Sequence, residues 1–132
     1  MNLQVPPNCD LTLGLRCVDK SEPGHTVWEM RADERFANPG NVVQGGFLAA
    51  MLDSAMGASA VTSLEGRRAR VANAEMKVSF LRAAKVGSIL RCDAQVLEAG
   101  STVIFVEATV RDNDDRLIAT ASSTYIAKER SQ

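Results

Sequence analysis

The chain has 132 residues, of which 45% are hydrophobic and 23% are charged, and its formal net charge is −1. This length suits a single compact domain over residues 1–132, and this composition excludes a disordered or fibrous chain. The charge balance argues against a nucleic-acid partner, because proteins that contact phosphates need an excess of Lys and Arg.

The cysteines and the hydrophobic segments indicate the compartment. Cys9, Cys17 and Cys92 are odd in number and widely spaced, which disfavours a disulfide framework or a zinc site and suits a reducing cytoplasm. The N-terminus lacks the basic and apolar regions of a signal peptide. The longest apolar stretch, 47–64, contains Asp53 and many small or hydroxyl residues, so a buried helix is expected there and not a membrane span. We expect a cytoplasmic protein with no metal, cofactor or membrane partner.

Short elements are predicted before residue 47. Residues 9–18 are consistent with a short helix and the start of a strand, and a turn at 22–24 precedes a strand at 26–30. Residues 35–46 are rich in Asn, Pro and Gly and predict a loop. The following residues, 47–63, are apolar or small on nearly every helical face. This segment therefore predicts a long helix that is covered almost all round.

After residue 67 the hydrophobic pattern changes to a period of two, which predicts strands. In the first strand one face would carry Ala72, Ala74, Met76, Val78 and Phe80, and the other Asn73, Glu75, Lys77 and Ser79. Three further strands are predicted at 88–98, 102–111 and 116–127, with turn residues between them. Short connections imply antiparallel neighbours. The expected fold is α+β, with a four-strand antiparallel meander wrapped around the one long helix.

Asp53 is the only ionisable residue between Arg35 and Glu65. A carboxylate on an apolar helix is costly to bury unless it is hydrogen-bonded or partly solvated. Two interpretations stay open at this point. Asp53 is either a structural acid whose hydrogen bonds are satisfied, or a catalytic base or nucleophile held in a cleft.

Gln44, Gly45 and Gly46 immediately precede the predicted helix. A helix N-terminus presents unpaired N–H groups and a partial positive charge, and glycine lets a ligand approach the backbone. This arrangement suits an oxyanion hole for a carbonyl group, although a flexible turn has the same composition. The single histidine, His25, offers no metal cluster, and no Gly-x-Ser-x-Gly elbow or phosphate-binding loop is present.

The spacing of these residues is similar to that of a known family. Asn38, five residues, Gln44-Gly45-Gly46, six residues and Asp53, followed by a strand that ends at residues 80–87, resembles the hotdog-fold acyl-CoA thioesterases of the phenylacetate-degradation type. The resemblance covers roughly residue 36 to the C-terminus. The family pattern has histidine where this chain has Gln44, and that is the main departure.

The resemblance implies a set of site residues and an assembly. Asp53 would attack the thioester or activate water, the Gly46 N–H would polarise the carbonyl, and Asn38 would position the carbonyl or the water. Gln44, at the position of the family histidine, would be the fourth catalytic residue and would orient the thioester. Relatives hold substrate at the positions of Gly45, Asn73, Phe80, Leu81, Arg82, Ala83, Lys85, Glu98, Gly100 and Ser101. The protein would be a homodimer or homotetramer in which Asn38 and Gln44 face Asp53 across the interface.

Three functions can be weighed from these residues. The first is hydrolysis of an acyl-CoA thioester to free acid and CoA. A hotdog dehydratase or hydratase would need a histidine near the Gln44 loop, which is absent. A non-catalytic acyl-CoA-binding hotdog protein stays open, because glutamine forms hydrogen bonds but does not titrate near neutral pH. The acyl pocket is expected to be lined by helix residues such as Met51, Ala55 and Met56.

Overall fold

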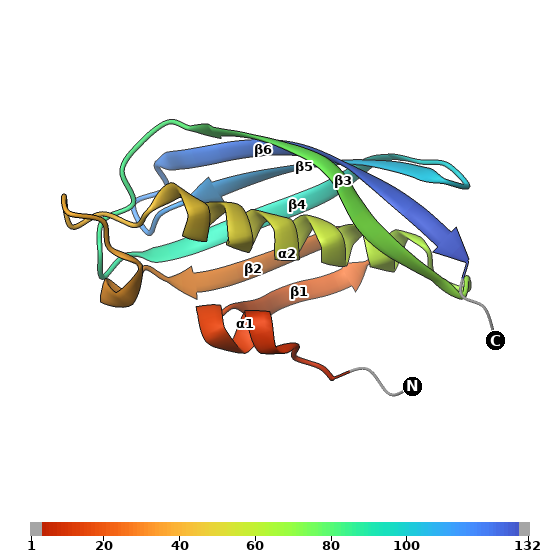
Figure 1. Cartoon of the computed structure of the whole chain (residues 1–132), viewed down its shortest axis with the longest axis horizontal. Helices are drawn as coiled ribbons and strands as arrows, with labels where there is room; N and C mark the ends of the chain where they lie inside the picture. Colours follow the sequence, from red (N-terminus) through yellow and green to blue (C-terminus); the bar gives the residue numbers. More distant parts are fainter. Residues whose placement is uncertain (1–3, 130–132) are drawn as a thin grey trace.

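The computed structural model describes residues 4–129, which form a curved six-stranded antiparallel sheet with one long helix across its concave face (Figure 1). In chain order the elements are α1 (Asn8–Leu13), β1 (Arg16–Glu22), β2 (His25–Arg31), the 3-10 helix η1 (Glu34–Phe36), α2 (Gly45–Ser63), β3 (Ala69–Phe80), β4 (Ile89–Ala99), β5 (Val103–Arg111) and β6 (Leu117–Glu129). The expected antiparallel sheet wrapped around a single long helix is confirmed.

Helix α2 buries one side against the sheet and leaves the other side open. Its buried residues recur every three or four positions: Leu48, Met51, Leu52, Ala55, Met56, Ser59 and Ala60. This spacing places them on one face of the helix. Asp53 and Val61 are exposed on the other side. The expectation that the helix is covered almost all round is therefore wrong for a single chain.

The predicted four-strand meander is wrong, because β3 does not pair with β4. The strand order is β1-β2-β4-β5-β6-β3, so β3 lies at a sheet edge beside β6. The connection after β3 is not a hairpin turn. The Leu81 N–H donates to the Ile118 carbonyl, the Val43 N–H donates to the Ala84 carbonyl, and the Gly87 N–H donates to the Ala32 carbonyl. These bonds carry the chain past the N-terminal end of α2 to the other side of the sheet.

The predicted faces of β3 are correct only in its second half. Met76 and Val78 are partly buried and pack on the core, as expected. In the first half Ala72 is exposed and Asn73 is half-buried, the reverse of the prediction. The register with β6 shifts between Asn73 and Glu75. A β-bulge of this kind adds one residue and exchanges the two faces of the strand.

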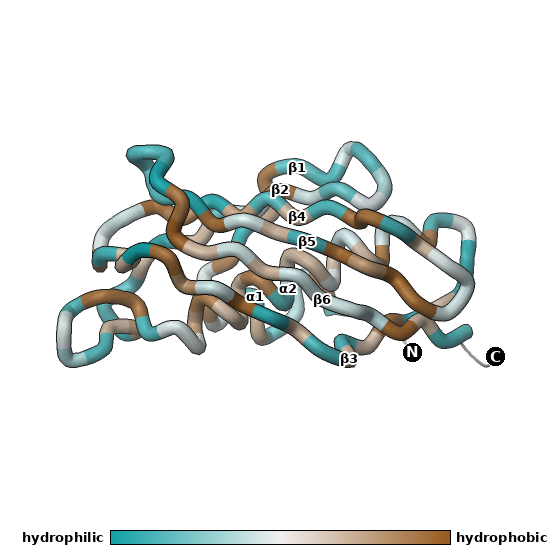
Figure 2. The backbone as a smooth tube through the Cα atoms, turned by 90° about the horizontal axis from the view of Figure 1, so that it is seen from above, coloured by the Kyte–Doolittle hydropathy of each residue, from teal (hydrophilic) through white to brown (hydrophobic). Residues whose placement is uncertain are grey.

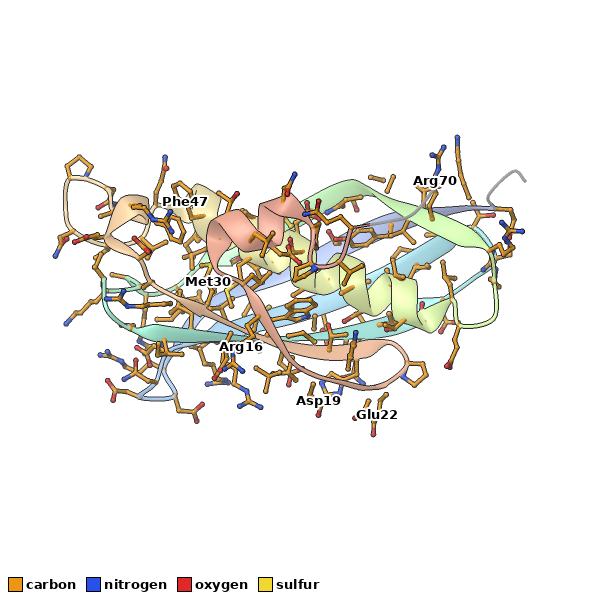
Figure 3. All side chains as sticks on the ribbon, turned by 90° about the horizontal axis from the view of Figure 1, so that it is seen from below. Arg16, Asp19, Glu22, Met30, Phe47 and Arg70 are labelled. Carbon is orange, nitrogen blue, oxygen red and sulfur yellow. The ribbon has the colours of Figure 1, made fainter. Side chains whose placement is uncertain are left out.

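The core lies between α2 and the sheet, and Met30 of β2 is among its fully buried side chains (Figure 3). A polar network joins three elements inside this core. The Thr26 and Ser59 hydroxyl oxygens are 2.7 Å apart, and Ser59 donates to the Ala94 carbonyl oxygen at 2.9 Å.

Hydrophilic residues gather at the β1–β2 and β5–β6 turns (Figure 2). Among residues 4–129 no helix is long and apolar enough to cross a membrane.

Candidate active site

Asp53 lies on the open side of α2, in a cleft of about 540 Å³. One wall is α2 itself and the other is the short helix α1, which runs beside it (Figure 3). The lining residues are Cys9, Thr12, Leu13, Gln44, Gly46, Phe47, Ala50, Asp53 and Ser54. The fold thus brings together three of the predicted catalytic residues, namely Gln44, Gly46 and Asp53.

The carboxylate of Asp53 accepts two hydrogen bonds, both on Oδ1. The Tyr125 hydroxyl lies 2.8 Å from this oxygen, and the Asn73 side-chain amide donates to it at 2.9 Å. The Ser123 hydroxyl in turn lies 3.1 Å from the Asn73 Oδ1 and 2.9 Å from the Glu75 carbonyl oxygen. Because a carboxylate only accepts hydrogen bonds, the Asn73 amide presents its NH₂ group to Asp53. Asn73 was predicted as a substrate-binding residue, and the structure places it next to the Asp53 carboxylate.

Tyr125 is the residue of this cluster that the sequence did not single out. Its side chain is 2% exposed. Burial, together with the neighbouring Asp53 carboxylate, raises the pKa of Tyr125 above its usual range, so the hydroxyl keeps its proton. The sequence contains one indication of a special role, because Tyr125 is the only tyrosine. In β6 it lies on the same face as the buried residues Ala121, Ser123 and Ala127. Its proximity to Asp53 depends on the sheet order.

The N-terminus of α2 supplies backbone donors to the same cleft. The N–H groups of the first helical turn have no acceptor within the helix, and they carry partial positive charge. Gln44 is the N-cap residue, and its side chain forms no capping hydrogen bond. The helix start is anchored by Phe47, whose ring stacks on Phe36 with centroids 4.5 Å apart (Figure 3). A carbonyl oxygen placed near Gly46 would meet donors of this kind.

Asn38 does not line this cleft. Its side-chain oxygen accepts the N–H groups of Gly40 at 2.9 Å and Val42 at 3.3 Å. Its backbone N–H also donates to the Val42 carbonyl oxygen. In a single chain Asn38 therefore holds the shape of the loop that leads into α2, and it is not brought to Asp53.

Five of the ten predicted substrate-binding residues gather in a second hollow, of about 390 Å³, on the other side of the α2 N-terminus. It is lined by Val43, Gly45, Leu48, Phe80, Leu81, Arg82, Ala83 and Ala84. Lys85 is adjacent, since it forms a β-bridge with Val42. The five predicted residues Gly45, Phe80, Leu81, Arg82 and Ala83 are thus brought together.

Glu98, Gly100 and Ser101 are not brought to this hollow. They belong to the β4–β5 hairpin, which lies near the C-terminal end of α2 (Figure 1). The Ser101 carbonyl oxygen accepts a hydrogen bond from Arg67, which follows that helix. The two groups of predicted substrate-binding residues are separated by most of the 19-residue helix, about 28 Å in length.

The predicted acyl-pocket residues are not at the cleft. Met51, Ala55 and Met56 are 0% exposed and belong to the core beneath α2. They lie on the helix face turned toward the sheet, whereas Phe47, Ala50 and Ser54 of the same helix line the cleft. The single histidine, His25, also does not line the cleft. Its Nε2 lies 2.8 Å from the Asp93 carboxylate on the neighbouring strand β4.

Comparison with known proteins identifies the family to which the chain is similar. Residues 40–119 match the family model of the thioesterase superfamily. The human acyl-coenzyme A thioesterase 13 is 26% identical over 118 residues, which are 89% of this chain and 83% of that protein.

Two solved structures have the same hotdog architecture. A thioesterase family protein from Silicibacter pomeroyi has a TM-score of 0.87 and 30% identity, over 95% of this chain and 92% of that one. The Escherichia coli PaaI protein from the phenylacetic acid degradation operon has a TM-score of 0.85 and 18% identity, over 96% of this chain and 86% of that one. The expected resemblance to hotdog acyl-CoA thioesterases is confirmed.

Proposed function

Because this chain belongs to the thioesterase superfamily, we propose that it hydrolyses acyl-CoA thioesters to a free carboxylic acid and CoA. The observation that carries this proposal is the surroundings of Asp53. An exposed carboxylate, hydrogen-bonded within residues 4–129 at one oxygen only, shares a cleft with the N-terminus of α2. Such a carboxylate can act as a base or nucleophile, and N–H groups at a helix N-terminus can act as donors for a developing oxyanion, although the two groups that act together need not come from one chain.

Two routes lead from this arrangement to the same products. As a base, Asp53 takes a proton from water, the hydroxide oxygen bonds to the thioester carbon, and the C–S bond then breaks. The CoA thiolate leaves and regains a proton. As a nucleophile, a carboxylate oxygen of Asp53 bonds to the thioester carbon and expels the thiolate, and water hydrolyses the resulting anhydride. In both routes the Gly46 N–H stabilises the negative charge on the carbonyl oxygen.

We propose that each complete site is shared by two copies of the chain. Gly46 and Asp53 are seven residues apart on α2, about 10 Å of helix rise. This separation is too long for both groups of one chain to act on a single thioester, since each must come within hydrogen-bonding reach of the reacting atoms. Asn38 and Gln44 of a second copy would then face Asp53. A homodimer, or a homotetramer built from two dimers, supplies such sites.

Two surfaces of the chain suit this assembly. The open side of α2 exposes Val61, which is 49% exposed and lies eight residues beyond Asp53 on the helix. Strand β3 has a neighbour on one side only and is 12 residues long. A long edge strand is a template for pairing with another chain. Pairing of β3 with its copy would continue the sheet and bring two α2 helices side by side.

CoA would extend from the shared site over the predicted substrate-binding residues. The hollow at Gly45, Phe80 and Arg82 lies beside the α2 N-terminus, so it would accept the part of CoA nearest the thioester. Glu98, Gly100 and Ser101 would contact CoA from another copy, since they lie at the opposite end of their own chain.

The second candidate function is acyl-CoA binding without hydrolysis, and Gln44 is the feature that favours it. A glutamine cannot transfer a proton near neutral pH. A thiol-release assay across acyl-CoA esters of different length and aromatic content separates the two functions. Free thiol released in proportion to enzyme supports hydrolysis. Saturable binding of acyl-CoA with no thiol release would establish the binding protein instead.

A further inference from the structure

We propose that Tyr125 is a positioning residue for Asp53, and that Asp53 reacts through its other carboxylate oxygen, Oδ2. This inference rests on the proposed hydrolysis and goes beyond it by assigning the roles of individual atoms. It is carried by the contacts of two strands, β3 and β6, with the middle of α2.

The first step is the contrast between the exposed side chain of Asp53 and the buried side chain of Tyr125. Asp53 is an exposed residue, and a short exposed side chain can change rotamer freely. Tyr125 is buried, and its ring is held within the core. Its hydroxyl lies 2.8 Å from the Asp53 Oδ1 and 3.0 Å from the Asp53 backbone carbonyl oxygen. One rigid group thus contacts both the side chain and the backbone of Asp53.

The second step concerns which oxygen is occupied. Tyr125 and Asn73 both lie against Oδ1, and we call this pair the Oδ1 clamp. Within residues 4–129 no protein group forms a hydrogen bond with Oδ2. A carboxylate oxygen has two lone pairs, so Oδ2 is free to take a proton from water or to bond to carbon.

The third step explains why a buried tyrosine suits this place. Its pKa is raised by burial and by the Asp53 carboxylate, so the hydroxyl stays protonated at any pH at which the enzyme works. The donor therefore never becomes a phenolate, which would repel the carboxylate. Ser123 serves the other half of the clamp, because its hydroxyl contacts the Asn73 Oδ1 at 3.1 Å.

The clamp fixes the direction of Oδ2. A displacement of about 1 Å at a reacting group can cost roughly 10²-fold in rate. We infer that removal of the Tyr125 hydroxyl slows turnover.

The test is Tyr125→Phe, which keeps the ring and removes only the hydroxyl. We expect kcat to fall about 10-fold to 100-fold while KM changes by less than about twofold. Thr124→Val is the matched control, since it deletes a hydroxyl from the adjacent residue of β6. Within residues 4–129 that hydroxyl forms its one side-chain hydrogen bond with the Glu75 carboxylate. Its kcat should equal that of the wild type, and thermal unfolding should show both variants folded.

A second variant keeps the inference testable if Tyr125→Phe does not fold. Ser123→Ala removes the hydroxyl that contacts the Asn73 Oδ1 and the Glu75 carbonyl oxygen. It should lower kcat by a smaller factor than Tyr125→Phe, again at constant KM. A folded Tyr125→Phe, or in its place Ser123→Ala, with wild-type or higher kcat overturns the inference.

Asp53→Asn, measured in parallel, separates this inference from the proposed function. If Asp53→Asn is inactive while Tyr125→Phe has full activity, the positioning role is wrong and the hydrolytic role of Asp53 stands. If Asp53→Asn has full activity, or the wild type releases no thiol from any acyl-CoA, the proposed function fails and the role of Tyr125 fails with it.

Discussion

The ring of Phe80 packs so closely on Gly45 that a Cβ at this glycine would lie 3.0 Å from the ring Cζ atom. The next residue, Gly46, has no such neighbour, since a Cβ there would meet nothing within 4 Å. Gly45 and Gly46 therefore have different structural roles. Gly45 lets the end of β3 pack against the start of α2, whereas Gly46 leaves its backbone open to a ligand or to a second chain.

This difference predicts the behaviour of Gly46→Pro. Proline lacks the N–H donor and is tolerated in the first turn of a helix, where that N–H has no partner within the helix. We expect kcat to fall about 10²–10³-fold, as for the loss of one oxyanion-hole donor. Gly46→Ala is the control because it keeps the N–H, and its kcat should fall less. Equal losses in the two variants would show that bulk, and not the N–H, matters at this position.

A shared site predicts that two inactive variants restore each other. In a mixture of Asp53→Asn and Gly46→Pro chains, a hybrid dimer has one site with the intact Asp53 of one chain and the intact Gly46 of the other. Random exchange in a dimer would restore about a quarter of wild-type turnover. The measurement is thiol release before and after mixing, with light scattering to establish the assembly. If mixing restores no turnover although the chains exchange, the Asp53 carboxylate and the Gly46 N–H act from one chain.

Gln44→His tests the departure from the family pattern. Gln44 lines the cleft with an exposed side chain and is nine residues from Asp53 on the same chain. We expect it to orient substrate by hydrogen bonds, so that histidine changes kcat by less than about threefold near neutral pH, where it is mostly uncharged. The kcat–pH profile of both proteins checks this. A tenfold or larger rise in the variant would show that glutamine limits turnover.

The local pattern of the sequence predicted much of this fold. The run of apolar and small residues at 47–63 marked α2, and Asp53 stood out because it is the only charged residue in that run. The open side of α2 was not predicted, because an apolar helix face has the same sequence pattern whether it packs on its own sheet or on another chain.

Features that depend on distant pairing were not predictable from local pattern. The placement of β3 beside β6 depends on the path of residues 81–88, whose hydrogen bonds are formed with Ile118, Val43 and Ala32. The bulge after Asn73 exchanged the faces of β3 and turned an amide inward. Tyr125 contacts Asp53 because β6 lies between β5 and β3 in the sheet, against the middle of α2.

Asp112 predicts a pH-dependent contribution to stability at the β5–β6 turn. Its carboxylate accepts the backbone N–H groups of Arg116 and Asp114, each at 3.0 Å, and the Arg116 guanidinium. The Arg116 N–H chiefly holds the pKa of Asp112 below its usual range. Because the folded-state pKa is the lower one, this stabilisation is present above the unfolded-state pKa and is lost as pH falls through the folded-state pKa.

Asp112→Asn should therefore lower the thermal unfolding midpoint near neutral pH. The gap between the variant and the wild type should narrow below about pH 4, where the unfolded-state carboxyl group becomes protonated. Unfolding followed by circular dichroism over this pH range measures it. A gap that is independent of pH would mean that the carboxylate charge contributes nothing at this turn.

The most direct measurement is the turnover of Asp53→Asn on an acyl-CoA that the wild type hydrolyses. Asparagine keeps the size of the side chain and can still accept hydrogen bonds from Tyr125 and Asn73, but it has no negative charge. We predict that substrate binding and thermal unfolding stay close to wild type while kcat falls by roughly 10²–10⁴-fold, as expected for removal of a general base. A variant that keeps more than about a tenth of wild-type kcat would contradict the catalytic role of Asp53, because loss of the base leaves far less.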